Sequence, residues 1–161
     1  MTPRAALPPL WTCPKCGAKF VSANMSHSCG RCELDALFTK SEPHVFELFQ
    51  TLKRMVERCG PSTTIPQKTR VVFVVRMRFA SAVVRKSHLR IGLILEWLLP
   101  ADPRIVETMS FAPRCHAHYF KIERAEQLDR SILGWLREAY DCGTQKNFQR
   151  VGNSARRKPP A

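Results

Sequence analysis

Residues 70–95 read RVVFVVRMRFASAVVRKSHLRIGLIL, and this stretch decides the fold because its apolar side chains recur at every second position. A period of two is the pattern of a β-strand that buries one face. The pattern predicts one strand over residues 70–79 and another over residues 88–95. The buried faces comprise Val71, Phe73, Val75, Met77 and Phe79 in the first strand and Leu89, Ile91, Leu93 and Leu95 in the second.

Periodic patterns on both sides of this stretch complete the fold class. Apolar residues spaced by three and four positions from Val45 to Val56 predict an amphipathic helix, with Ser41 as its N-cap and Gly60 as its end. The other predicted elements are strands near Ile105–Ser110 and Cys115–Lys121 and a second helix that begins near Leu128 and ends before Gly143. This order indicates an α+β fold, in which an antiparallel sheet is flanked by an N-terminal and a C-terminal helix.

Composition divides the 161 residues into one ordinary domain and a small appendage. The predicted parts are a flexible N-terminus (1–10), a cysteine-rich segment (11–32), the α+β domain (41–142) and a basic tail (144–161). The tail has five Lys or Arg residues and no acid, which is typical of disorder. No apolar run reaches the roughly 18 residues that span a bilayer, and no secretory signal is recognisable, so we expect a cytoplasmic protein.

Four of the seven cysteines form two Cys-x-x-Cys pairs, Cys13 with Cys16 and Cys29 with Cys32, with twelve residues between the pairs. This spacing is typical of a zinc ribbon, in which each pair directs two thiolates at one tetrahedral ion. His27 lies beside the second pair, so the fourth ligand is either His27 or Cys32. We expect one Zn²⁺ per chain and a segment whose folding depends on it. Reduced thiols without a metal are the alternative interpretation.

The chain is strongly basic, and its central part lacks acids. Lys and Arg total 26 against 13 Asp and Glu, a formal net charge of +13, and no acid occurs between Glu57 and Glu96. Alternation places the basic residues on the strand face opposite the apolar one. If the faces of successive strands coincide, they form a site for phosphate or carboxylate groups; a solvated surface is the alternative. The candidates are Arg70, Arg76, Arg78, His88, Arg90, His116 and His118.

The sequence contains no recognisable catalytic apparatus. Metal-dependent nucleases hold their cations with clustered carboxylates, which the central strands lack. A Gly-x-Ser-x-Gly element and a glycine-rich phosphate loop are also missing. We therefore assign no reaction and no catalytic residue, and we expect a protein that binds rather than catalyses.

Five short motifs carry a family resemblance. They are WTCPKCG at 11–17, HSCG at 27–30, IPQKTR at 65–70, RMRFA at 76–80 and WLREAY at 135–140. Over residues 11–142 the chain resembles a bacterial family of domains of unknown function, number 5655. The resemblance implies His27 and Cys29 as metal ligands, with Cys32 as an extra cysteine, and an association with nucleic-acid systems. It further implies a shared site made of Gln67, Lys68, Arg70, Arg76, Arg78, His116 and His118.

Charge, cysteine spacing and resemblance together favour a zinc-binding, non-catalytic module. We expect its basic sheet face to bind nucleic acid or another phosphate-rich ligand. One alternative is an enzyme or sensor that uses a pocket of arginines and histidines for a small anionic ligand. A second alternative is a protein-interaction module that is accessory to a larger assembly.

Overall fold

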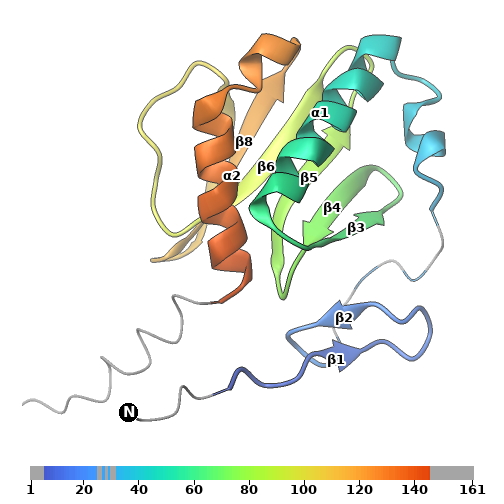
Figure 1. The fold of residues 1–161 in the computed structure, drawn as a ribbon, viewed down its shortest axis with the longest axis vertical. Helices are drawn as coiled ribbons and strands as arrows, with labels where there is room; N and C mark the ends of the chain where they lie inside the picture. The colour runs from blue at the N-terminus through green and yellow to red at the C-terminus, as the bar shows by residue number, and fades with distance from the viewer. Residues whose placement is uncertain (1–5, 25–26, 28, 30–31, 146–161) are drawn as a thin grey trace, which may run out of the picture.

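The computed structural model describes residues 6–24, 27, 29 and 32–145. Within these residues, a six-stranded antiparallel sheet is covered on one face by two α-helices, and a two-stranded sheet lies near the N-terminus (Figure 1). The elements of the main domain are α1 (Pro43–Cys59), β3 (Thr63–Pro66), β4 (Arg70–Val74), β5 (Arg78–Val84), β6 (Leu89–Leu95), β7 (Ile105–Ala112), β8 (Cys115–Ile122) and α2 (Arg130–Gly143). The α+β prediction is confirmed. The predicted tail lies outside the described residues from position 146 onward.

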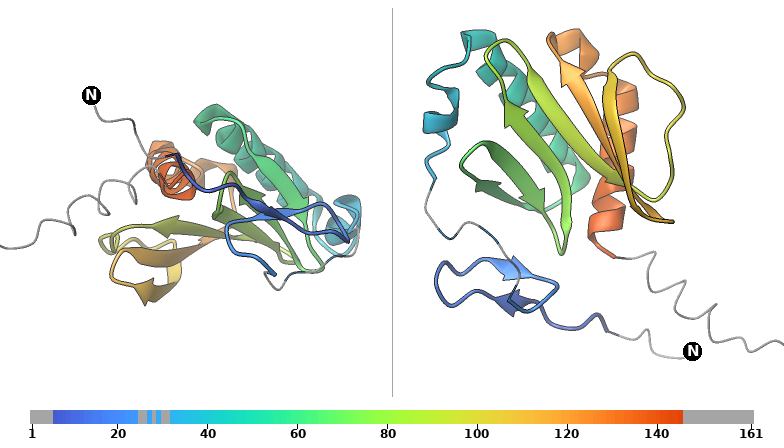
Figure 2. Two further views of the ribbon diagram at one scale, coloured as in Figure 1. Left: turned by 90° about the horizontal axis from the view of Figure 1, so that it is seen from below. Right: turned by 180° about the vertical axis from the view of Figure 1, so that it is seen from behind.

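The order of the strands across the sheet differs from their order in the sequence. The order across the sheet is β3-β4-β5-β6-β8-β7, so β8 lies between β6 and β7. All neighbouring strands pair antiparallel. Both helices lie on the same side of the sheet (Figure 2). We call the other side of the sheet the open face; it is turned to the viewer in the right panel of Figure 2.

The core fills the space between the sheet and the helices. Side chains from α1, α2 and strands β4, β5, β6 and β8 form one buried cluster. Of the buried face predicted for residues 70–79, Val71, Phe73 and Phe79 belong to it, whereas Val75 is half-buried and Met77 is exposed. The cluster's largest fully buried members are Phe49, Phe73, Phe79, Phe120, Leu52, Leu89, Ile91, Leu93, Leu95, Ile122, Ile132 and Leu136. The prediction that Leu89, Ile91, Leu93 and Leu95 form one buried strand face is therefore confirmed.

Helix α1 begins with a different cap from the one that the sequence predicted. Glu42 occupies the N-cap position in extended backbone, and Pro43 is the first helical residue, where its missing N–H costs nothing. The Ser41 hydroxyl instead donates to the carbonyl of Phe38. Gly60, the predicted end, follows the last helical residue with φ of 142°, a value that side-chain-bearing residues rarely adopt.

Helix α2 extends through Gly143, one residue beyond its predicted end. Asp129 caps the N-terminus by accepting a hydrogen bond from the backbone N–H of Ile132 at 3.1 Å. At the other end, Gly143 packs so closely that a Cβ atom there would lie 2.9 Å from side-chain atoms of Phe79 and Val75. The helix can therefore continue against the sheet only because residue 143 has no side chain.

The predicted strand over 70–79 is wrong, because the chain reverses within it. β4 ends at Val74 and β5 begins at Arg78, so the two form a hairpin. The turn residues Arg76 and Met77 donate their backbone N–H groups to the carbonyl of Gly143, at 3.3 and 3.0 Å. A contact with α2, which is distant in sequence, thus holds this turn. None of the described helices is long and apolar enough to cross a membrane.

Candidate metal centre and basic sheet face

The N-terminal hairpin brings the first two cysteines together. β1 (Trp11–Thr12) pairs antiparallel with β2 (Lys19–Phe20), and the loop between them carries Cys13 and Cys16. Gly17 has φ of 74°, and its backbone N–H donates to the carbonyl of Cys13 at 2.8 Å. A residue with a side chain would be strained at this φ, so Gly17 allows the loop to close tightly.

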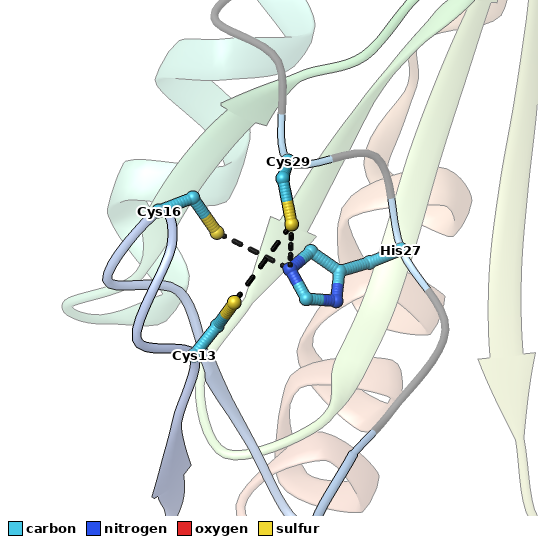
Figure 3. A group of neighbouring side chains, drawn as sticks. All are labelled: Cys13, Cys16, His27 and Cys29. Atoms are coloured by element: carbon cyan, nitrogen blue, oxygen red, sulfur yellow. Dashed lines mark hydrogen bonds between the residues drawn. The ribbon is translucent and has the colours of Figure 1, made fainter.

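Four potential ligand atoms converge beside this hairpin. The sulfur atoms of Cys13, Cys16 and Cys29 and the imidazole of His27 all lie within 4.8 Å of one another. His27 Nε2 lies 3.2 Å from Cys16 Sγ and 3.1 Å from Cys29 Sγ, and the sulfurs of Cys13 and Cys29 are 3.8 Å apart. The four side chains point toward one another (Figure 3). Three sulfurs and one imidazole nitrogen are a donor set that can hold a metal ion.

The structure distinguishes between the two candidates for the fourth ligand. His27 belongs to the cluster, whereas the half-buried Cys32 does not. The cluster therefore consists of Cys13, Cys16, His27 and Cys29, the set that the family resemblance implied. The cysteine-rich segment is compatible with a zinc-ribbon-like unit.

Aromatic side chains of the hairpin support the imidazole. The ring of Phe20 lies 4.4 Å from the ring of His27, and Trp11 lies 6.2 Å from Phe20, centroid to centroid. No sequence motif identified Phe20 as a neighbour of the cluster. Its ring packs against the imidazole of His27, a potential ligand.

The thiols of the cluster differ in acidity. Burial opposes ionisation of Cys13, but hydrogen bonds from the backbone N–H groups of Cys16 and Lys15 outweigh it and lower its pKa to about 6. Burial, followed by the proximity of Cys13 and Cys16, raises the pKa of Cys29 to about 11. One thiolate thus makes the next one harder to form. A divalent cation would supply the positive charge that allows several thiolates to coexist.

The second candidate site lies on the open face of the main sheet. In the register of the sheet, Arg70 of β4 is opposite Val83, Val83 is opposite Arg90, and Arg90 is opposite Lys121. Residues directly opposite in a sheet point to the same face, so these cations share the open face. Arg78 pairs with Val74 at the start of β5 and belongs to the same face.

Arg70 and Arg78 lie at opposite ends of the β4–β5 pairing, where Arg70 is opposite Val83 and Arg78 is opposite Val74. Burial, followed by the charge of Arg70, lowers the pKa of Arg78, while the neighbouring Tyr119 acts in the opposite direction. Gln67, in the turn that precedes β4, accepts a hydrogen bond from Arg70 Nε at 2.9 Å through its side-chain oxygen. Lys68 is exposed in the same turn. The structure therefore brings Gln67, Arg70, Arg78 and Arg90 to one face.

Two of the predicted site residues lie at the margins of this face. Arg76 is in the β4–β5 turn, and its guanidinium donates to the carbonyl of Pro8 at 2.6 Å and to the side-chain oxygen of Gln145 at 3.1 Å. It therefore ties the N-terminal segment and the end of α2 to the turn. His88 lies just before β6, where burial and then the charge of Lys121 lower its pKa.

The prediction that His116 and His118 face the arginines is wrong. His118 pairs with Leu93 and His116 with Leu95, which places both imidazoles on the helix-covered face. His118 is 1% exposed, and its Nε2 accepts a hydrogen bond from the backbone N–H of Leu99. His116 accepts a hydrogen bond from Ser110 and donates one to the carbonyl of Pro113. The two histidines are thus buried and hydrogen-bonded on the opposite side of the sheet.

Tyr119 is an open-face residue that the sequence did not single out. Tyr119 lies between His118 and Phe120 on β8, so its side chain points to the face opposite theirs, the open face. In the register of the sheet it pairs with Gly92. The Arg90 guanidinium lies 4.7 Å from the centre of its ring. The alternation within CHAHYFKI (115–122) was the signal that could have identified Tyr119.

Comparison with known proteins finds a match for the sheet-and-helix part of the chain. Residues 34–143, more than half of the sequence, match the family described as "Domain of unknown function (DUF5655)". The match begins after the Cys/His cluster, so it covers the sheet and its helices alone. No curated protein and no solved structure gives a significant match. Through its sheet-and-helix domain, the chain belongs to the DUF5655 family.

Proposed function

We propose that this chain is a zinc-binding protein whose open sheet face binds nucleic acid without catalysing a reaction. The zinc assignment is supported by the donor set of Cys13, Cys16, His27 and Cys29. Thiolate and imidazole ligands suit Zn²⁺, whereas Mg²⁺ and Ca²⁺ prefer oxygen ligands. Because all four positions of a tetrahedron are filled by side chains, the ion would have a structural role.

The charge of the open face carries the nucleic-acid proposal. Glu107 is the one acidic residue in the described strands β3 to β8, and it forms an ion pair with Arg90. The same face carries Arg70, Arg78 and Lys121 as well. A surface with several cations and one neutralised acid attracts a phosphate backbone and releases its counterions.

The separation of the histidines from the arginines argues against a small anionic ligand bound by both kinds of side chain. That alternative required guanidinium and imidazole groups in one pocket, and the sheet places them on opposite faces. The open face instead presents its cations across several neighbouring strands. An extended anion such as a nucleic-acid strand fits this distribution better than a small metabolite does.

Fluorescence anisotropy with labelled oligonucleotides tests the proposal. The double variant Arg70→Gln/Arg78→Gln should bind more weakly than the wild type, and the slope of log affinity against log salt should fall by about 1 for each phosphate that the variant no longer neutralises. The variant Arg54→Gln/Arg58→Gln removes the same charge from exposed positions on α1 and serves as the control. Equally weakened binding in the two variants would show that net charge, rather than the open face, causes binding.

A further inference from the structure

We propose that Arg70, Arg78 and the Tyr119 hydroxyl form a phosphate-binding subsite at the centre of the open face. The inference rests on the proposed function and gives it a specific location. The chemical group recognised is a phosphoryl group, as part of a nucleic-acid backbone or of a free phosphorylated compound. Three observations on the described residues support the inference. The side chain of Tyr119 extends over a neighbouring strand, its ring is held in place by Arg90, and Arg70 and Arg78 have no acidic partner.

The side chain of Tyr119 can extend over β6 because residue 92 is a glycine. A Cβ atom on Gly92 would lie 3.0 and 3.3 Å from ring carbons of Tyr119 and 2.7 Å from the Ser81 hydroxyl oxygen. The Tyr119 ring therefore lies on the backbone of β6, next to a residue of β5. Tyr119 belongs to β8, so its side chain extends over the neighbouring strand β6, on the side where β5 and β4 follow.

Arg90 and Glu107 hold the ring of Tyr119 in place. The Arg90 guanidinium lies over the ring at 4.7 Å from its centre, and Glu107 forms an ion pair with the same guanidinium. Glu107 is also the residue of β7 that pairs with Tyr119. Because Arg90 occupies one face of the ring and β6 lies against it, the ring offers no free platform for a stacked base. Its hydroxyl is the group left for recognition.

The arginines beyond the ring lack an acidic partner. Among the described residues, neither Arg70 nor Arg78 forms an ion pair with a carboxylate. In the register of the sheet, Arg70 lies two residues before Val72 on β4, and Arg78 is opposite Val74, two residues after Val72. The row of Val72, Ser81, Gly92 and Tyr119 therefore runs between the two arginine positions. Gln67 orients Arg70 through its hydrogen bond. Two guanidiniums without acidic partners, one on each side of this row, can bind an anion between them.

The chemistry of these groups matches a phosphoryl group. Guanidinium groups donate paired hydrogen bonds to phosphate oxygens, and a phenol hydroxyl adds one further donor. Binding at this point should therefore be independent of base sequence and sensitive to phosphate.

The test compares Tyr119→Phe with Tyr140→Phe. Tyr119→Phe removes one hydroxyl and keeps the ring under Arg90, so oligonucleotide affinity should fall roughly tenfold with little change in the salt slope. Tyr140 lies on α2 and donates its hydroxyl hydrogen bond to Pro61, so Tyr140→Phe makes the same chemical change away from the open face. Oligothymidylate and inorganic phosphate are the two probes, and affinity is measured for the full chain.

The outcomes separate the subsite from the wider function. Weaker oligonucleotide binding by Tyr119→Phe but not by Tyr140→Phe supports the subsite on a nucleic-acid backbone. Unchanged oligonucleotide binding by Tyr119→Phe overturns the subsite and leaves the proposed function intact. If the wild type binds inorganic phosphate but no oligonucleotide, and Tyr119→Phe weakens phosphate binding, the subsite stands and nucleic-acid binding fails. If the wild type binds neither probe, both proposals are overturned.

Discussion

Gly92 leaves the space on the open face that the ring of Tyr119 occupies. Replacing it with alanine should force that ring and the Ser81 side chain to shift, because the added methyl group would lie within 3.0 Å of both. We expect Gly92→Ala to lower the free energy of unfolding by about 1–3 kcal/mol. Oligonucleotide affinity should fall with it, since the Tyr119 hydroxyl moves away from the arginines. Thermal unfolding and fluorescence anisotropy measure the two effects.

Gly134 provides the matched control. It lies in α2, and a Cβ atom added there meets no atom within 4 Å. Gly134→Ala should therefore raise the free energy of unfolding by about 0.5–1 kcal/mol, the usual gain in a helix interior. It should leave binding unchanged. If Gly92→Ala instead matched Gly134→Ala in both measurements, Gly92 would have no role in positioning Tyr119.

The N-terminal hairpin is the element whose order we expect to depend on the proposed zinc ion. β1 and β2 contribute four residues in all, and apart from Cys13 the buried apolar core of the protein lies in the main domain. A hairpin of this size has too little buried surface to be stable alone. The proposed zinc ion and the contact of Phe20 with His27 would supply the missing stability.

Two cysteine variants test this element. Cys16→Ser removes a member of the cluster, and it should abolish stoichiometric zinc binding and increase amide hydrogen exchange in the hairpin. Cys32→Ser makes the same chemical change outside the cluster, and it should retain about one zinc ion per chain. Metal analysis and hydrogen exchange are the measurements. Zinc loss in Cys32→Ser but not in Cys16→Ser would mean that the ligand set is wrong.

The helices were easier to predict than the β4–β5 hairpin, for a physical reason. Both helices have apolar residues at a helical period and end signals of their own, such as Asp129 and Gly60. The turn at Val75–Met77 contains no glycine, proline or asparagine, and its alternating pattern continues across the reversal. The carbonyl of Gly143 on α2 holds the turn, so its cause lies far away along the chain.

At the scale of the whole molecule, part of the net charge of +13 is concentrated on one side of the sheet. The cations of the central strands gather on the open face, while the helix-covered face contains the apolar core. The sequence contains the acid-free stretch, and it predicted the alternation and most members of the Cys/His cluster. These features depend on neighbouring residues and need no knowledge of how the strands are ordered.

The two histidines show what the alternation alone did not establish, namely which face of the sheet they occupy. Alternation showed that His116 and His118 share a face but did not identify which face. Phe120 and Ile122 have the same parity, and both are fully buried under the helices. Continuing the alternation along the same strand would have assigned the histidines to the core. β8 lies next to β6, and this position determines which side chains share the open face. Only the sheet topology shows it.

The most direct test of the central claim is to map the binding surface by NMR. The ¹⁵N-labelled full chain is titrated with oligothymidylate, and backbone amide shifts are followed along all described strands and helices. We predict that the shifts concentrate on β4, β5, β6 and β8, around Arg70, Arg78 and Tyr119. Shifts confined to α1 and α2, or no shifts at all at low salt, would contradict the claim that the open face binds nucleic acid.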